Sequence, residues 1–371
     1  MKKLFAMLLA VIMVLGLVAC GGGNNGGNTD NNGGSNNESG YNGKSFTIYM
    51  ASDLTENNDQ AAPLRFFRDL VAEKSGGKIT VDVAWAGTQF DNAGIWSAMQ
   101  SNILNMDIML MNKHGGNAPL MSWGFMPYSA TAAESIKQTN YMLFENETTS
   151  KIIADYFAGF NMTILGNSCD GAPSFVTTFA WDGLNDLVNK CAAFGTMNTA
   201  KYLSIGLNCT AVTGPDAYDN LSRGIIDGCS SAIGAALTNS LYEVAKYCTV
   251  DGQYTSSVLI VANSEFWGGL EEDAKALLTE CIEATSAYSA EYITESTKTS
   301  AEQWKELTGN DVVFMNEEDG KAFWAQTLAA IATNSAKNAA GKPYEQDMLT
   351  LLTEWVAYQE EYHGIDIDWE A

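Results

Sequence analysis

The chain has 371 residues and a formal net charge of −24 at pH 7, from 44 acidic and 20 basic side chains. This negative excess opposes binding to phosphate backbones and anionic lipid headgroups, and so argues against nucleic-acid-binding functions. The 46% hydrophobic content is typical of a chain that builds a core, and the part after residue 43 is long enough for two packed domains.

The first residues have the pattern of an export signal. Met1-Lys2-Lys3 is a positive n-region, residues 4–18 are apolar, and the sequence LVAC at 17–20 resembles a bacterial lipobox, in which the cysteine is lipidated and becomes the new N-terminus. The apolar run is shorter than the ~20 residues that a membrane-spanning helix needs. We therefore expect a lipoprotein signal peptide at 1–19 and lipidation of Cys20. An uncleaved signal or a chance cysteine is the alternative.

The next segment, 20–43, is expected to be a Gly/Asn-rich tether. Nine of the 23 residues after Cys20 are Gly and eight are Asn, so little apolar surface is present to offset the entropy of ordering the chain. Random-coil scaling gives such a tether a reach of roughly 25–30 Å. The expected location is therefore the extracellular face of the cytoplasmic membrane, with a lipid anchor.

Strands and helices are predicted to alternate in the remaining chain. Alternating or unbroken apolar runs predict strands at 46–50, 78–85, 108–111, 162–165, 175–179, 192–195, 211–213 and 258–262. Apolar residues at helical spacing predict helices over 63–74 and from Trp96 to Met106, and Ser75-Gly76-Gly77 is the stop signal of the first. The absence of Pro and Gly from 270 to about 307 predicts a single long helix. Two more helical stretches are predicted at 317–337 and 344–362. The unbroken run at 108–111 is typical of a parallel strand covered on both faces. Such alternation predicts an α/β fold.

Six cysteines follow Cys20, without a C-x-x-C pair that would indicate zinc or redox chemistry. They are Cys169, Cys191, Cys209, Cys229, Cys248 and Cys281. An exported chain permits disulfides, but small apolar core positions are the expected use of these side chains.

The sequence offers little for catalysis. His114 and His363 are the only histidines, which argues against a histidine metal site and most catalytic triads. No G-x-S-x-G, P-loop or H-E-x-x-H motif occurs. The acidic clusters at 271–273 and 317–319 fall where helices are predicted to begin, so the helix dipole explains them better than a glycosidase carboxylate pair. We expect a protein that is not an enzyme, with no catalytic residues, metal or cofactor.

Four stretches share their order and spacing with one known family. They are EKSGGKI at 73–79, DAYDNLSRGIIDG at 216–228, LYEVAKY at 241–247 and VLIVANSEFWGGL at 258–270. Together they resemble the DctP-type substrate-binding proteins of TRAP (tripartite ATP-independent) transporters, over roughly residues 44 to 300. The resemblance implies a two-lobed, periplasmic-binding-protein-like clamp with crossing hinge strands and a long bracing helix. It also implies that the clamp closes over one small solute and delivers it to TRAP membrane permease subunits.

This architecture predicts two lobes built from discontinuous segments. Lobe I is expected at 44–170 plus about 257–297, and lobe II at 171–256 plus about 298–371 with the C-terminal helices. The alternatives are a solute-binding lipoprotein of an ABC transporter, a surface glycan-acting enzyme with paired carboxylates, and a sensor that presents its ligand to a receptor kinase.

The chain departs from the family at the ligand's charge partner. The family's usual ligand is a carboxylate held by arginine, whose guanidinium can bind both oxygens. The matching positions carry Ala193 and Pro173 here, and the three arginines of the chain, Arg65, Arg68 and Arg223, fall in other helices. We therefore expect a small neutral polar solute rather than an acid. An acid held by a lysine in place of the arginine is the alternative.

Alignment with the family's ligand shell gives ten ligand-binding candidates. They are Ser52, Asp91, Asn92, Trp96, Asn112, Lys113, Phe194, Thr196, Asn198 and Ser231. Several lie at predicted strand ends, where ligands of parallel sheets usually bind. Structural roles are the alternative for each: Asp91 and Asn92 would cap a helix, Trp96 and Phe194 would belong to the core, and Ser231 would satisfy a local backbone group.

Overall fold

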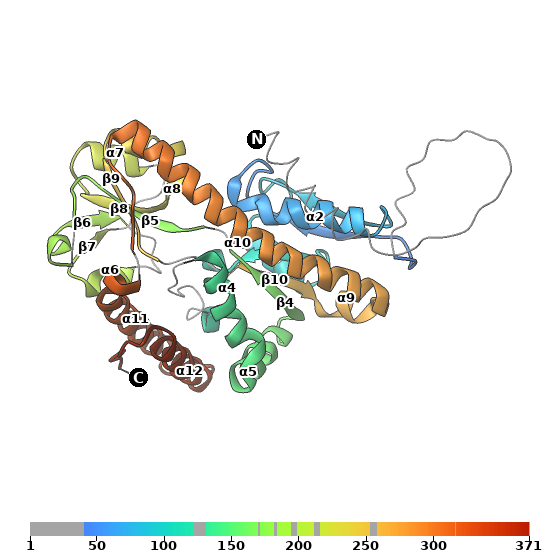
Figure 1. Cartoon of the computed structure of the whole chain (residues 1–371). Coiled ribbons are helices and arrows are strands. Elements are labelled where there is room, and N and C mark those ends of the chain that lie inside the picture. The colour runs from blue at the N-terminus through green and yellow to red at the C-terminus, as the bar shows by residue number, and fades with distance from the viewer. Residues whose placement is uncertain are drawn as a thin grey trace, which may run out of the picture. The chain divides into compact units, whose positions relative to one another are not determined.

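Strands and helices alternate along the chain, as Figure 1 shows for the computed structural model. The structure describes the ranges 41–121, 131–169, 171–181, 184–193, 199–210, 216–252, 258–315 and 317–370. The predicted signal peptide, Cys20, most of the tether and the strand predicted at 211–213 lie outside these residues. The other predicted strands are present within a few residues of their expected bounds.

The first sheet consists of two parallel strands joined by a helix. The bounds are β1 (Phe46–Ala51), α2 (Ala62–Lys74) and β2 (Ile79–Ala84). Phe67 and Val71 are fully buried on the helix face that packs against this sheet. Gly76 and Gly77 follow the helix with positive φ angles, which glycine adopts without strain, so the sequence signal for the helix end is confirmed.

The second sheet has the strand order β3-β10-β4. Its strands are β3 (Met106–Leu110), β10 (Val258–Asn263) and β4 (Met162–Ser168). Both outer strands run antiparallel to β10. Ile108 and Met109 are buried, as predicted for the 108–111 run. The predicted parallel pairing is wrong, since β3 is antiparallel to β10. This partner comes from a distant part of the chain, so the local sequence does not reveal its direction. The helix from Trp96 to Met106 was predicted too long, since α3 (Asn92–Gln100) ends earlier and Met106 begins β3.

The third sheet has six strands in the order β11-β9-β5-β8-β6-β7. They are β5 (Pro173–Thr177), β6 (Cys191–Ala193), β7 (Asn208–Thr210), β8 (Gly228–Ala232), β9 (Tyr247–Val250) and β11 (Val313–Phe314). β5 is antiparallel to β8 and β9, whereas β6 is parallel to β7 and β8. Gly224 follows the end of α7 (Ala217–Ser222) with a φ of 66°, which glycine adopts without strain, and the chain turns there from the helix towards β8.

Two chain crossings connect these sheets. The chain passes from β4 into β5 and returns from β9 to β10. We call the first two sheets with their helices lobe I, and the six-stranded sheet with its helices lobe II. α10 (Glu272–Thr308) packs against α2 and β4 of lobe I and against α8 (Ile233–Thr238) of lobe II, and its length is evident in Figure 1. The two-lobed α/β fold with crossing strands and a bracing helix is thereby confirmed.

The remaining helical elements cover the sheets and the C-terminal region. They are η2 (Asp59–Ala61), η3 (Met111–Lys113), α4 (Ala132–Asn140), the π-helical η5 (Tyr141–Glu145), α5 (Glu147–Ala158), η6 (Leu184–Leu187), α6 (Thr199–Ser204), η9 (Leu241–Glu243), α9 (Ser264–Gly269), α11 (Glu317–Ala339) and α12 (Glu345–His363). α11 packs on α6 and on α12, and α12 also contacts α5.

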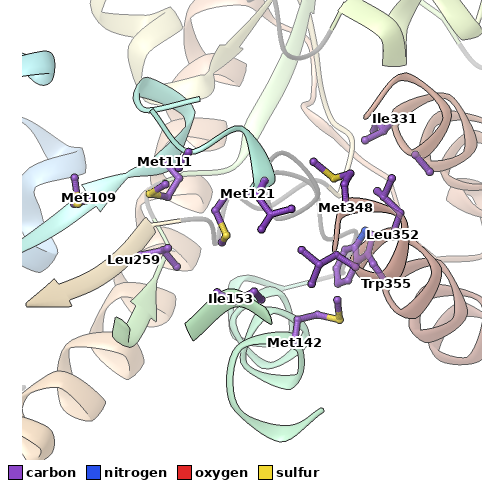
Figure 2. Close-up of a cluster of buried hydrophobic side chains, with 14 of the residues drawn as sticks. Met109, Met111, Met121, Met142, Ile153, Leu259, Ile331, Met348, Leu352 and Trp355 are labelled. Carbon is purple, nitrogen blue, oxygen red and sulfur yellow. The ribbon is translucent and has the colours of Figure 1, made fainter. Parts of the chain in front are cut away.

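The largest buried cluster contains side chains from both lobes, and many of them are methionines (Figure 2). In Figure 2, Met142 and Ile153 lie beside Leu352 and Trp355 of α12. Two further contacts tie α12 to lobe I: a buried hydrogen bond of 3.0 Å from Gln359 Nε2 to Gln138 Oε1, and a ring stack of Tyr358 on Tyr141 with centroids 4.4 Å apart. The C-terminal helix therefore packs against both α11 and lobe I.

The six cysteines after Cys20 are free thiols. Cys229 and Cys248 lie opposite Val176 on the two strands that flank β5, so an intervening strand keeps them apart. Burial raises the pKa of both thiols to about 12, which leaves them protonated and unreactive near neutral pH. Their use as small core side chains agrees with the sequence analysis.

Candidate functional site

Three elements of lobe I bring polar side chains to one edge. β1 and β2 are parallel, and their carboxyl ends are tied together because Ser52 N donates a hydrogen bond of 2.9 Å to Ala84 O. α3 begins at Asn92, and η3 continues directly from β3 to Lys113. Ligands of parallel sheets usually bind at the carboxyl ends of the strands. The structure thus gathers several of the predicted residues at this edge.

An ion pair lies at the centre of this edge. Lys113 Nζ is 2.7 Å from Asp53 Oδ2 and 2.9 Å from Asp53 Oδ1. Asn92 Nδ2 donates a further hydrogen bond of 3.2 Å to Asp53 Oδ2. The side chains of Lys113 and Asp53 keep 27% and 28% of their surface exposed, so water still reaches the pair.

Asp53 was missed by the sequence analysis, which selected its neighbour Ser52. The available signal was an acidic residue directly after β1, at the edge where Lys113 was already a candidate. The sequence alone does not reveal this contact, because 60 positions separate the two residues.

Two other candidates make local structural contacts. Asp91 caps α3, since its Oδ1 accepts a hydrogen bond of 2.8 Å from Gly94 N. Ser52 is 9% exposed, and its Oγ accepts from Leu54 N at 3.2 Å. The cap is the structural alternative that was considered for Asp91, and a ligand role for Asp91 or Ser52 stays a prediction. Asn112 lies in η3, but its side chain is outside the described structure.

Trp96 is a core residue in this structure. It is 4% exposed and its ring packs near Phe160, His114 and Phe157, at centroid distances of 5.1, 5.6 and 6.3 Å. This burial favours the core role over a direct contact with solute. An apolar wall for the ligand stays a prediction for Trp96.

Two titratable side chains near this edge are buried, Asp107 in β3 and His114 directly after η3. Asp107 is 2% exposed, and burial raises the pKa of its carboxyl to about 8, despite a 2.9 Å hydrogen bond from Ile108 N to its Oδ1. Burial and then the nearby charge of Lys113 lower the pKa of His114 to about 4. Within the described residues His114 Nδ1 has no hydrogen-bond partner. At neutral pH both side chains are therefore predominantly uncharged.

Asp107→Asn is expected to change how the free energy of unfolding depends on pH. Between about pH 4 and about pH 8, the carboxyl of Asp107 is protonated in the folded protein. In the unfolded chain the same carboxyl has a pKa of 3.8 and has lost its proton over this range. Wild-type stability therefore falls as pH rises through this range, whereas asparagine does not titrate and keeps the acceptor for Ile108 N. Urea unfolding should show the variant gaining more than about 1.4 kcal/mol on wild type between about pH 5 and about pH 8. A difference that stays constant with pH would contradict the buried, protonated carboxyl.

In lobe II, the two positions at which the family resemblance places arginines lie on the strands that flank β8. Pro173 begins β5 opposite Ala232 of β8, and Ala193 ends β6 opposite Cys229 of β8. Ser231 lies in β8, and its Oγ donates to Ala232 O at 3.2 Å, which is the local backbone role considered as its alternative. Its ligand role remains a prediction. The candidates Phe194, Thr196 and Asn198 directly follow β6 and lie outside the described residues.

The three arginines are bound elsewhere. Arg65 donates to the backbone carbonyls of Glu56 and Asn58, Arg68 pairs with Glu56 and Asp69, and Arg223 is exposed beside Asp219. None of their described contacts is at the strand ends of either lobe. The structure places Arg65 and Arg68 in α2 and Arg223 directly after α7, so the expected location of the three arginines in these helical segments is confirmed, and the absence of a ligand arginine stays a prediction.

The described ranges contain no group of three or more His, Cys, Asp or Glu side chains arranged to hold a metal ion. Nor is any described helix both long and apolar enough to cross a membrane.

Comparison with known proteins identifies the family. The model of the DctP family, described as bacterial extracellular solute-binding protein, family 7, matches residues 50–338. The chain belongs to this family. The C4-dicarboxylate-binding protein DctB of Bacillus subtilis is 20% identical over 288 residues, which are 74% of this chain and 78% of DctB. The ectoine-binding periplasmic protein TeaA of Halomonas elongata is 28% identical over 123 residues, 33% of this chain and 36% of TeaA.

Solved structures of DctP relatives have the same fold. The ectoine-binding protein of the TeaABC TRAP transporter, in its apo state, has a TM-score of 0.73 at 20% identity and covers 85% of this chain and 100% of its own. A TRAP periplasmic solute-binding protein from Rhodobacter sphaeroides in an apo open structure gives 0.71 at 18% identity, covering 85% and 98%. The chain is therefore a two-lobed extracytoplasmic solute-binding protein of the TRAP type, as its sequence signatures predicted.

Proposed function

We propose that this DctP-family protein captures a small uncharged polar solute between its lobes and delivers it to a TRAP permease. The observation that carries the ligand class is the sheet edge of lobe II, where Ala193 and Pro173 replace the arginines expected from the family. Neither side chain can donate a hydrogen bond. A carboxylate that loses its water there would need other donors to compensate for its lost hydration.

The names of some relatives weigh against an uncharged solute. DctB is named for C4-dicarboxylates, and solved TRAP-type neighbours contain D-glucuronate, β-D-galacturonate or pyroglutamate. These proteins are 16–20% identical to the chain, a level at which the likeness carries the fold and leaves the ligand open. The residues at the strand ends of this chain therefore decide the proposal.

Solute capture would require the two lobes to move. We assign lobe I to 44–170 plus about 257–297 and lobe II to 171–256 plus about 298–371, so that both crossings act as hinges. The polar edge around Asp53 and the edge around Ser231 would then approach each other over the solute. Nothing in this process requires bond making or breaking, and we propose no enzymatic activity.

The N-terminal sequence supports attachment to the membrane. The lipobox-like LVAC and the Gly/Asn-rich tether after it favour a lipid anchor at Cys20 on the extracellular face of the cytoplasmic membrane. A tether with a reach of roughly 25–30 Å would let the folded part approach a permease in the same membrane.

Thermal unfolding in the presence of matched compounds tests the ligand class. The matched panel pairs each acid with an uncharged analogue: glucuronate with glucose, galacturonate with galactose, pyroglutamate with 2-pyrrolidone, and succinate with succinamide. A ligand at 100 times its dissociation constant adds about 2.7 kcal/mol of stability. We expect stabilisation by an uncharged member and none by its acid partner. Stabilisation by acids alone would contradict the proposal.

A further inference from the structure

We propose that Asp53 is a specificity determinant that masks the ammonium of Lys113 and so excludes acidic solutes from the polar edge of lobe I. This inference rests on the proposed function, because it assumes that the solute reaches that edge. It concerns a residue that neither the sequence signatures nor the family alignment selected.

The geometry of the pair gives Asp53 this role. Both of its oxygens face Lys113 Nζ, at 2.7 and 2.9 Å, and they occupy two of the three N–H donors of the ammonium. Asn92 Nδ2 holds Oδ2 from the other side at 3.2 Å, which fixes the orientation of the carboxylate. An incoming carboxylate would have to share the ammonium with a carboxylate already in contact with it.

The three arginines and Lys190 make contacts elsewhere in the chain. The three arginines are engaged on α2 and beside α7. Lys190 lies at the start of β6, the end opposite Ala193, with its Nζ 4.5 Å from the centre of the Phe179 ring. The chain segments 122–130, 194–198, 211–215 and 253–257 contain no lysine or arginine. Lys113 and Asp53 are the charged pair that the described part of this edge presents to a solute.

The same pair suits hydroxyl and amide groups. The third N–H of Lys113 can donate, the carboxylate oxygens of Asp53 can accept, and hydrogen bonds to charged groups are stronger than neutral ones. The pair carries one positive and one negative charge, so Asp53 offsets the attraction that Lys113 alone would have for an anion. A solute carboxylate that approached Lys113 would also lie beside the carboxylate of Asp53, and like charges placed side by side weaken binding strongly. The pair therefore disfavours carboxylates.

Calorimetry with the matched panel tests the role of Asp53. Asp53→Asn keeps the side-chain size and removes the negative charge, so the affinity for the acid members should rise about 10- to 100-fold over wild type. Adding Lys113→Met to Asp53→Asn should abolish that gain. The control is Asp155→Asn, which removes one carboxylate from the exposed ion pair with Lys151 and changes the net charge equally. This control should leave every affinity within about twofold of wild type, because exposed pairs are screened.

Three outcomes would overturn the inference, and the first two separate it from the proposed function. If wild type binds an uncharged member but Asp53→Asn gains no affinity for acids, solute capture stands and the masking role of Asp53 is wrong. If wild type prefers acids and Asp53→Asn does not alter their affinity, the ligand class and the masking role both fail. An equal gain of acid affinity in Asp155→Asn would show an effect of net charge and would also overturn the masking role.

Discussion

Trp324→Ala is expected to lower the free energy of unfolding by about 3–5 kcal/mol, the cost of removing a large aromatic side chain from a packed core. The indole is fully buried in α11, and its Nε1 donates a 3.0 Å hydrogen bond to Asp251 O, directly after β9. Two glycines pack against the indole. A Cβ atom added at Gly320 would lie 2.5 Å from the indole, and a Cβ atom added at Gly252 would lie 2.9 Å from it. The side chain thus connects a C-terminal helix to the chain crossing, and alanine would leave a cavity there.

Urea denaturation of the purified variants measures this effect. Trp324→Phe should lose less than Trp324→Ala, because it keeps most of the packing and loses the hydrogen bond to Asp251 O. Leu203→Ala on α6, where the side chain is 54% exposed, is the control and should stay within about 0.5 kcal/mol of wild type. A loss below about 1 kcal/mol for Trp324→Ala would show that this indole does not hold the C-terminal helices in place.

Cys20→Ala is expected to move the whole protein from the membrane fraction to the medium. Each buried lipid CH₂ contributes about 0.8 kcal/mol of membrane affinity, so loss of the acyl chains removes the attachment. The fold should be unaffected, because the tether separates Cys20 from the residues that pack. Fractionation of cells, with thermal unfolding of the released protein, checks both expectations.

Ser39→Ala is the control for this experiment, since it alters the tether and keeps the cysteine. It should remain at the membrane like wild type. If Cys20→Ala also remains firmly membrane-bound, the N-terminal segment is an uncleaved membrane anchor and the lipid proposal is wrong.

Local sequence patterns predicted much of the fold. Apolar alternation at 78–85 gave β2, the Gly76-Gly77 pair gave the end of α2, and a stretch at 271–307 without Pro or Gly gave α10 as one helix. The direction of β3 was not predictable in the same way. Its hydrogen bonds go to β10, about 150 residues later, and an apolar run looks alike in parallel and antiparallel sheets.

The candidate site was only partly predictable, because local patterns do not show contacts between distant parts of the chain. Lys113 and Asn92 were selected by alignment with the family's ligand shell, and they lie after a strand and at a helix start, which local patterns can locate. Asp53 was missed, because its importance comes from a contact with Lys113 that only the folded chain creates. Trp96 has the helical spacing of both a core residue and a ligand wall, and its 4% exposure favours the core.

Small-angle X-ray scattering with and without a stabilising compound from the matched panel tests the central claim most directly. The claim is that an uncharged polar solute binds between the lobes and draws them together about the two chain crossings. The account predicts a smaller radius of gyration when an uncharged compound is bound and no change when its acid partner is added at the same concentration. Compaction caused by the acid and absent with the uncharged compound would contradict the account.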